Sequence, residues 1–251
     1  MLRALRKSDL RYIFADSASK SNGPFTCPEC DEEVVLKVGK VRINHFAHVN
    51  PVACKFATGE SETHRRCKLE IYQALLKHPR VQDVALELPL GSVRPDVSAT
   101  INGIRVAIEV QISALSMETI IHRTQEYERK GVYVLWLPQW TPYLDGARYS
   151  PRLWEKWVHA AYFGRIYYWL KGLQVVAYHF DPHFTRVPRM NWYAVNGRKM
   201  SRGGYSRKSK RFRCAIRGKT LNLAHDFMPR EREHWDGGSM RIPFAKLLIG
   251  R

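Results

Sequence analysis

Acidic residues are scarce in this chain. Its 251 residues include 41 Lys and Arg but only 23 Asp and Glu, so the formal net charge is +18 at pH 7. From residue 182 to residue 225 there are twelve basic residues and no acidic one. A surplus of this size predicts a polyanionic partner. Nucleic acid is the simplest such partner, with an anionic membrane or a merely solubilising surface charge as the alternatives.

Long hydrophobic runs are also missing. No segment approaches the roughly 18 apolar residues that a membrane-spanning helix requires, and the first residues lack the continuous apolar core of a signal peptide. We therefore expect a chain without membrane spans that resides in the cytoplasm. The sequence shows no internal repeat. Apolar residues make up 45% of it and aromatic residues 12%, which is enough for a hydrophobic core.

Cysteine is limited to five residues, an odd number clustered toward the N-terminus. This pattern favours a metal site in a reducing compartment over a disulfide framework. Cys27 and Cys30 are followed by His45 and His48, and then by Cys54, which gives five candidate ligands for a structural, tetrahedral zinc ion. We favour Cys27, Cys30, His48 and Cys54, with His45 able to replace either of the last two. The alternatives are a redox pair of cysteines, or free cysteines and surface histidines. The absence of a βαβ pattern counts against the redox pair.

Composition divides the chain into four expected parts. These are a Cys/His segment over residues 1–58, a mixed α+β or α/β core over 59–140, an aromatic-rich extension of the core over 141–195, and a basic, partly flexible tail over 196–251.

Local patterns predict the elements of the core. Helices are expected over residues 61–77 and 116–130, each starting at a Ser N-cap. Alternating apolar residues predict a strand over 84–90, and the short apolar run over 132–137 predicts a buried strand. With a two-stranded hairpin over 94–111, the order is α-β-β-β-α-β.

This hairpin places two carboxylates side by side. Asn102-Gly103 between alternating apolar residues predicts a type I′ turn, because both central positions of that turn need a positive φ. Counting outward from the turn, Asp96 faces Glu109, and Gln111 follows on the same face. Like charges directly opposite each other destabilise a sheet, so we expect a divalent cation to offset them.

The helix after residue 60 carries a second group of polar side chains. Glu60, His64 and Lys68 are spaced by four residues and share a stripe with the apolar Ile71, so we expect this side to face the interior. Glu62 is expected to point the other way. The alternative is a solvated stripe of i,i+4 pairs.

Five segments together closely resemble the competence protein CoiA family. They follow in order from about residue 25 to residue 137: HFAH (45–48), GESETHRRCK (59–68), RPDV (94–97), AIEVQIS (107–113) and HRTQEYERKGVYVLWL (122–137). The aromatic segments GRIYYW and VVAYHF are also similar.

The resemblance implies a restriction-endonuclease-like, PD-(D/E)xK nuclease core behind an N-terminal zinc-binding segment. Asp96 is then the motif aspartate and Glu109 the acidic residue, while Gln111 stands where the motif has Lys. Glutamine positions by hydrogen bonding alone, so Lys68 is expected to supply the missing positive charge. The expected catalytic residues are Asp96, Glu109, Gln111, Lys68, Glu62, His64 and Glu60.

The expected activity is Mg²⁺- or Mn²⁺-dependent hydrolysis of DNA, with the metal on Asp96 and Glu109 and a role in DNA uptake, recombination or processing. Partners are single-stranded, duplex or branched DNA and recombination proteins. The alternative is a catalytically inactive zinc protein that binds DNA or RNA. Residues expected to bind the nucleic-acid backbone are Arg198, Lys199, Arg202, Arg207, Lys208, Lys210, Arg211 and Arg213.

Overall fold

A six-stranded sheet forms the centre of the molecule. The computed structural model describes residues 1–39, 41–54, 60–237 and 240–251. Among neighbouring strands of this sheet, β18 and β9 are parallel, as are β9 and β8, and the other pairs are antiparallel. Its strands follow in the order β15 (Phe227–Arg232), β18 (Ala245–Gly250), β9 (Tyr133–Pro138), β8 (Ile104–Gln111), β7 (Val97–Ile101) and β6 (Val81–Leu86).

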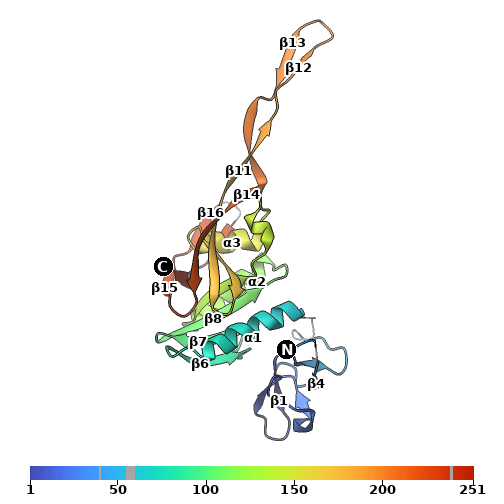
Figure 1. Ribbon diagram of the computed structural model, residues 1–251, viewed down its shortest axis with the longest axis vertical. Coiled ribbons are helices and arrows are strands. Elements are labelled where there is room, and N and C mark those ends of the chain that lie inside the picture. Colours follow the sequence, from blue (N-terminus) through green and yellow to red (C-terminus); the bar gives the residue numbers. More distant parts are fainter. Residues whose placement is uncertain (40, 55–59, 238–239) are drawn as a thin grey trace.

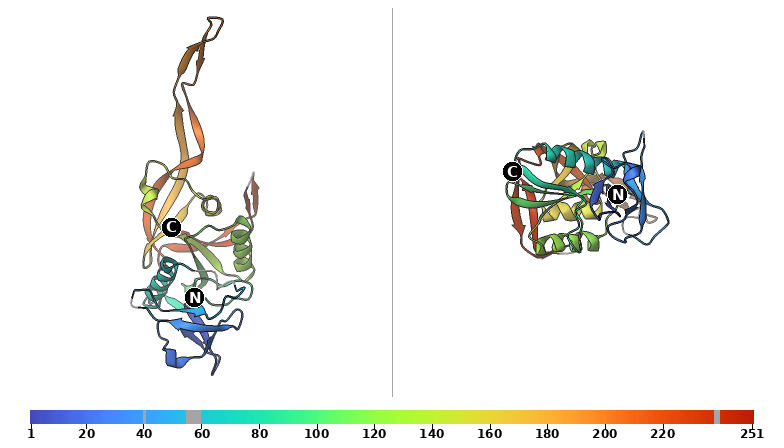
Figure 2. Two further views of the ribbon diagram at one scale, coloured as in Figure 1. Left: turned by 90° about the vertical axis from the view of Figure 1, so that its right-hand side faces the viewer. Right: turned by 90° about the horizontal axis from the view of Figure 1, so that it is seen from below.

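Helices cover both faces of this sheet. α1 (Glu62–Leu76) lies on one face and α2 (Met117–Arg129) on the other, with α3 (Leu153–Ala161) beside α2 (Figure 2). As expected, α1 and α2 start at Ser N-caps, because the hydroxyls of Ser61 and Ser116 accept hydrogen bonds from backbone N–H groups of the first turn. None of the described helices is both long and apolar enough to cross a membrane.

The order α1-β6-β7-β8-α2-β9 is the order that the sequence predicts for the core. The hairpin register is confirmed as well, since Val97 pairs with Ile108 and Ile101 with Ile104. Asn102 and Gly103 both have a positive φ, 50° and 78°, as a type I′ turn requires. Local sequence therefore determines the part of the sheet that carries Asp96 and Glu109.

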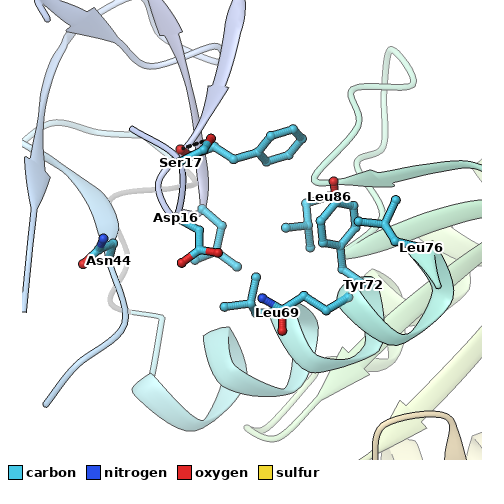
Figure 3. Close-up of a pocket in the computed structure, with 10 residues that line it drawn as sticks. Asp16, Ser17, Asn44, Leu69, Tyr72, Leu76 and Leu86 are labelled. Atoms are coloured by element: carbon cyan, nitrogen blue, oxygen red, sulfur yellow. Dashed lines mark hydrogen bonds between the residues drawn. The ribbon is translucent and has the colours of Figure 1, made fainter. Parts of the chain in front are cut away.

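The N-terminal segment forms a separate antiparallel sheet with its own small core around Phe25 and Phe46. A cavity of about 210 Å³ lies between this unit and α1, where Leu69 and Tyr72 face Asp16 and Asn44 (Figure 3). The expected boundary between residues 58 and 59 lies outside the described residues. The order of the strands is β2 (Tyr12–Phe14), β1 (Arg3–Arg6), β3 (Phe25–Thr26), β4 (Glu33–Lys37) and β5 (His45–His48), with a 3₁₀ turn, η1, at Lys20–Asn22.

A long two-stranded arm extends from the end of the molecule opposite to the N-terminal unit (Figure 1). The third strand at its base carries the aromatic residues expected in the core, and Tyr167 and Tyr168 there are buried. The 3₁₀ turn η2 (Pro142–Asp145) lies near this base. The strands of the arm and its base are β10 (Ile166–Lys171), β11 (Gln174–Val187), β14 (Tyr205–Asn222) and, at the outer end, β12 (Met190–Tyr193) and β13 (Lys199–Arg202).

The structure differs from the basic, partly flexible tail expected over residues 196–251. Most of these residues form strands: β14 pairs with β11 over most of its length, and β18 lies inside the central sheet. Leu247 and Leu248 are buried there, so the end of the described chain is part of the core. β16 (Trp235–Gly237) and β17 (Met240–Ile242) form a further small pair. The basic composition of β14 hid this strand, because its charged residues mask the alternation expected of a strand.

Candidate active site and metal centres

A cavity of about 750 Å³ opens where the start of α1 meets the start of β7 and the end of β8. The helix and the two strands come from separate parts of the chain, and they bring the polar stripe of α1 to the hairpin. Arg123 is among the residues that line this cavity. Five of the seven expected catalytic residues line it as well: Glu60, His64, Lys68, Asp96 and Gln111.

Glu60, His64 and Asp96 form a compact cluster in this cavity. The imidazole of His64 lies between the two carboxylates, with Nδ1 3.0 Å from Oε1 of Glu60 and Nε2 3.1 Å from Oδ2 of Asp96. The backbone N–H of Val110 also donates to Oδ2 of Asp96, at 2.9 Å, which fixes this carboxylate against β8. One ligand atom from each of the three residues lies within 4.8 Å of the others, so they could hold a metal ion together.

The charges of this cluster depend on one another. Burial would raise the pKa of Asp96, but the positive charges of Lys68 and His64 outweigh it and lower the pKa to about 2. Burial would lower the pKa of His64. The charge of Asp96 and the hydrogen bonds of the imidazole to Asp96 and Glu60 outweigh burial and raise this pKa to about 9. At neutral pH the cluster therefore holds ionised carboxylates bridged by an imidazolium, whose proton a metal ion would have to displace.

Lys68 is buried, with only 2% of its surface exposed. Its Nζ lies 2.6 Å from Oε1 of Glu87 and 3.5 Å from Oδ1 of Asp96, and it also forms an ion pair with Glu60. Sequence reasoning missed Glu87, which it placed in an alternating strand. The available signal was Lys68 itself, because a lysine on an apolar helix stripe needs a buried carboxylate partner.

Glu109 is held by α2 rather than by the cluster. Its carboxylate, also only 2% exposed, accepts hydrogen bonds from Arg123 and from the hydroxyl of Tyr127. Burial raises the pKa of Glu109 to about 7, against the lowering effect of the Arg123 charge. Protein groups therefore offset the charges of the hairpin: Lys68 and His64 at Asp96, and Arg123 at Glu109. The neighbouring helices thus supply cations of their own to this hairpin. A divalent cation on Asp96 and Glu109 stays a prediction.

Gln111 and Glu62 have partners of their own. The side-chain amide of Gln111 donates to the backbone oxygen of Ser113 at 3.0 Å, although Gln111 lines the cavity. The carboxylate of Glu62 accepts from the backbone N–H of Ile43 at 3.0 Å and pairs with Arg65 at 3.1 Å. The hydrogen bonds and ion pairs described for these two side chains thus go to partners other than Asp96.

The N-terminal unit brings together the four ligands that we favour for zinc, Cys27, Cys30, His48 and Cys54, whose ligand atoms all lie within 4.8 Å of one another. Sγ of Cys27 is 3.9 Å from Sγ of Cys54, and Sγ of Cys30 is 3.3 Å from Nε2 of His48. A tetrahedral zinc ion with ordinary bond lengths separates two sulfurs by roughly 3.8 Å, and a sulfur from a nitrogen by roughly 3.6 Å. The donor set therefore fits such an ion.

His45 does not join this cluster in the described part of the chain. Its Nδ1 lies 3.0 Å from the backbone oxygen of Ile43. His45 and His48 are three residues apart on β5, and side chains at odd spacing point to opposite faces of a strand. The alternation of side chains along β5 thus places His48, rather than His45, next to the three cysteines.

The basic residues expected to bind nucleic acid lie along the arm. Figure 1 shows this arm extending away from the sheet and from the N-terminal unit. Arg198, Lys199 and Arg202 belong to its outer hairpin. The others lie on β14: Arg207, Lys208, Lys210, Arg211 and Arg213.

Comparisons with known proteins agree with this arrangement. Residues 15–57 match the model "Competence protein CoiA, N-terminal domain", and residues 60–145 match "Competence protein CoiA, nuclease-like domain". The competence protein CoiA of Bacillus subtilis (strain 168) is 31% identical over 119 residues. This match covers 46% of the present chain but only 30% of that protein. No solved structure matches the chain. The two family models together cover about half of the chain, in the order of the N-terminal unit and the core, and the chain belongs to the competence protein CoiA family.

Proposed function

We propose that this chain is a metal-dependent deoxyribonuclease with a restriction-endonuclease-like, PD-(D/E)xK core, acting in DNA uptake, recombination or processing. One observation carries the proposal. Glu60, His64 and Asp96 converge in an open cavity, and the segment that contains them matches a nuclease-like domain.

The donor groups suit the metals of such enzymes. Mg²⁺ prefers carboxylate oxygens, and Mn²⁺ accepts an imidazole as well. Asp96 would be the central ligand. The other candidates are Glu60 just before α1, His64 on α1 and Glu109 on β8. When bound, the metal would lower the pKa of a water molecule and stabilise negative charge on the phosphoryl oxygen.

The protein's own residues prepare this site. The N–H of Val110 orients the carboxylate of Asp96, and Lys68 compensates for the negative charge gathered around it. Arg123 holds the carboxylate of Glu109, which a bound metal would have to share or displace. Loss of one proton from His64 would release one of the two neighbouring carboxylates for coordination, because a neutral imidazole keeps a single N–H donor. Gln111 would position a water or a phosphate oxygen through its amide, once this amide leaves Ser113.

A non-catalytic protein that binds DNA or RNA is the second candidate. It is favoured by the engagement of Glu109 with Arg123 and Tyr127 and of Gln111 with Ser113. In this reading the carboxylates serve only to anchor the helices on the sheet.

A cleavage assay separates the two candidates. Purified wild type is incubated with labelled single-stranded, duplex and branched DNA and with RNA, in Mg²⁺, in Mn²⁺ and without divalent metal. Asp96→Asn keeps the volume of the side chain and removes its charge. Glu118→Gln makes the same chemical change at an exposed position in the first turn of α2.

We expect metal-dependent cleavage of DNA by the wild type and by Glu118→Gln. Asp96→Asn should be slower by at least about 100-fold, since a catalytic metal contributes several kcal/mol to the barrier. Equal products from wild type and Asp96→Asn would reject the nuclease. Binding of nucleic acid without cleavage of any substrate would favour the second candidate.

A further inference from the structure

The outer end of the arm is a two-stranded ribbon, β12 paired with β13, that is exposed on both faces. All eight residues of the two strands are exposed to solvent, and Figure 1 shows the ribbon as the part of the arm farthest from the body. An isolated two-stranded hairpin is marginally stable in water. The large side chains on this ribbon therefore contribute little to the folding of the protein.

These side chains are aromatic and apolar nonetheless. Trp192 is 43% exposed and Tyr193 72%, and Met190 and Val195 are exposed as well. Side chains this exposed are available for contact with a partner.

Strand pairing sorts these side chains onto two faces. Trp192 pairs with Met200 and Tyr193 with Lys199, and residues paired across a ladder share a face. Neighbours along a strand alternate between faces. The ribbon therefore presents an aromatic ring on each side, with Arg202 on the side of Trp192 and Lys199 on the side of Tyr193.

The surroundings of the ribbon carry positive charge only. There is no acidic residue between residues 182 and 225, whereas Arg189, Arg198, Lys199 and Arg202 all lie on or next to the ribbon. A protein partner that buried these rings would also have to neutralise the cations. Aromatic rings next to cations match the chemistry of unpaired nucleotides, whose bases stack on rings while their phosphates pair with Arg and Lys.

We propose that the β12–β13 hairpin binds unpaired nucleotides, with Trp192 stacking on a base and Arg198, Lys199 and Arg202 contacting the flanking phosphates. This inference deepens the proposed function, because it gives the nuclease a preference for substrates with unpaired bases. The outer part of β11 and all of β12 lie between residues 182 and 193. A fully extended chain of this length spans roughly 35 Å, close to one turn of duplex DNA. The basic residues on β14 can thus follow duplex phosphates while the hairpin contacts a single-stranded region.

The test measures binding in the Asp96→Asn background, so that cleavage plays no part. Fluorescence anisotropy gives the affinity for a labelled 30-nucleotide single strand, a 30-base-pair duplex and a fork. Trp192→Ala is compared with Trp235→Ala, because both tryptophans are 43% exposed and Trp235 lies on β16, outside the arm. A third variant carries Arg198→Ala, Lys199→Ala and Arg202→Ala together.

Trp192→Ala should weaken binding to the single strand and the fork by about 5- to 150-fold, the range for loss of one stacked base. The affinity of Trp192→Ala for the duplex should change by less than about twofold. The affinity of Trp235→Ala for each of the three substrates should also change by less than about twofold. The triple variant should lower the dependence of log affinity on log salt by about 2, because three phosphate contacts to a single strand are lost.

Equal single-strand affinities of the Trp192→Ala and Trp235→Ala proteins would overturn the inference. The inference would also be overturned if Trp192→Ala lost binding to vesicles rich in phosphatidylserine while its DNA binding was unchanged. That result would assign the hairpin to membranes. Failure of the proposed function gives a different result. If the wild type binds DNA through Trp192 but cuts no substrate, the nuclease proposal is wrong and the binding proposal stands.

Discussion

Lys68 brings a positive charge into the interior of the core, among three carboxylates. Burial alone would lower the pKa of a lysine, but the charges of Glu87, Asp96 and Glu60 outweigh it and raise the pKa of Lys68. A fully buried ammonium in this setting contacts its carboxylates rather than solvent. Lys68 therefore places a positive charge near Asp96, as expected. Its ion pairs also hold the carboxylates of Glu60, Glu87 and Asp96 together.

Removing this charge should destabilise the protein strongly. Lys68→Met leaves Glu87 buried with less compensation, and breaking a buried ion pair costs about 3–5 kcal/mol. In the double variant Lys68→Met/Glu87→Gln the stranded charge is gone, so at least about half of that loss should be recovered. Urea unfolding monitored by circular dichroism gives the free energies.

Lys77→Met is the control, because Lys77 is an exposed lysine at the end of the same helix. Its effect should stay within about 0.5 kcal/mol. If the Lys68→Met protein is as stable as the Lys77→Met protein, the buried ion pair does not contribute to the free energy of unfolding.

At the level of elements, the parts of the fold that depend on neighbouring residues could be predicted. The Asn102-Gly103 turn fixed the register of β7 and β8, and the Ser N-caps fixed the starts of α1 and α2. Pairings between distant segments could not be predicted, because no local signal specifies them. β18 joins β9 across more than 100 residues, and a buried apolar run of this length does not reveal its partner.

Strand β5 provides a matched pair of histidines for testing the zinc site. His48→Gln removes a ligand from the Cys27, Cys30, His48 and Cys54 cluster, whereas His45→Gln changes the imidazole on the opposite side of the same strand. After dialysis against a weak chelator, we expect one zinc per chain in the wild type and in His45→Gln, and substoichiometric zinc in His48→Gln. Metal release with a colorimetric reagent measures the content.

Zinc removal should also unfold the N-terminal unit selectively. Burial raises the pKa of Cys27 to about 12 when no metal is bound, so loss of zinc leaves thiols in a small core that depends on the metal. Hydrogen exchange in excess chelator should rise in residues 1–54 and remain low in β8 and β9. Equal zinc contents in the two histidine variants would contradict the assigned ligand set.

At the scale of the whole molecule, the proposed catalytic cavity and the proposed single-strand contact lie in separate places. The cavity lies beside the N-terminal unit, at the start of α1, and the outer hairpin lies at the far end of the arm (Figure 1). Cleavage and recognition of unpaired bases can therefore be removed independently. β18 is an inner strand of the sheet between them, so the chain after the arm is part of the fold.

We therefore expect one deletion in the arm to leave the stability of the protein unchanged, and one deletion at the C-terminal side of the sheet to abolish folding. Val187 and Tyr205 form the last pair between β11 and β14. Replacing residues 188–204 by Asn-Gly closes the arm with a type I′ turn, and the melting temperature should change by no more than about 2 °C. Ending the chain after residue 239 removes β17 and β18, and with β18 the buried Leu247, Leu248 and Ile249.

Burial of each of these side chains contributes about 1.5–3 kcal/mol, and their sum is comparable to the whole stability of a domain. We therefore expect the truncated chain to be unfolded or insoluble. Calorimetry and circular dichroism on both proteins check this expectation. A soluble truncated chain that melts cooperatively at the wild-type temperature would mean that β18 is dispensable, and that the basic C-terminal part behaves as the tail that its composition suggests.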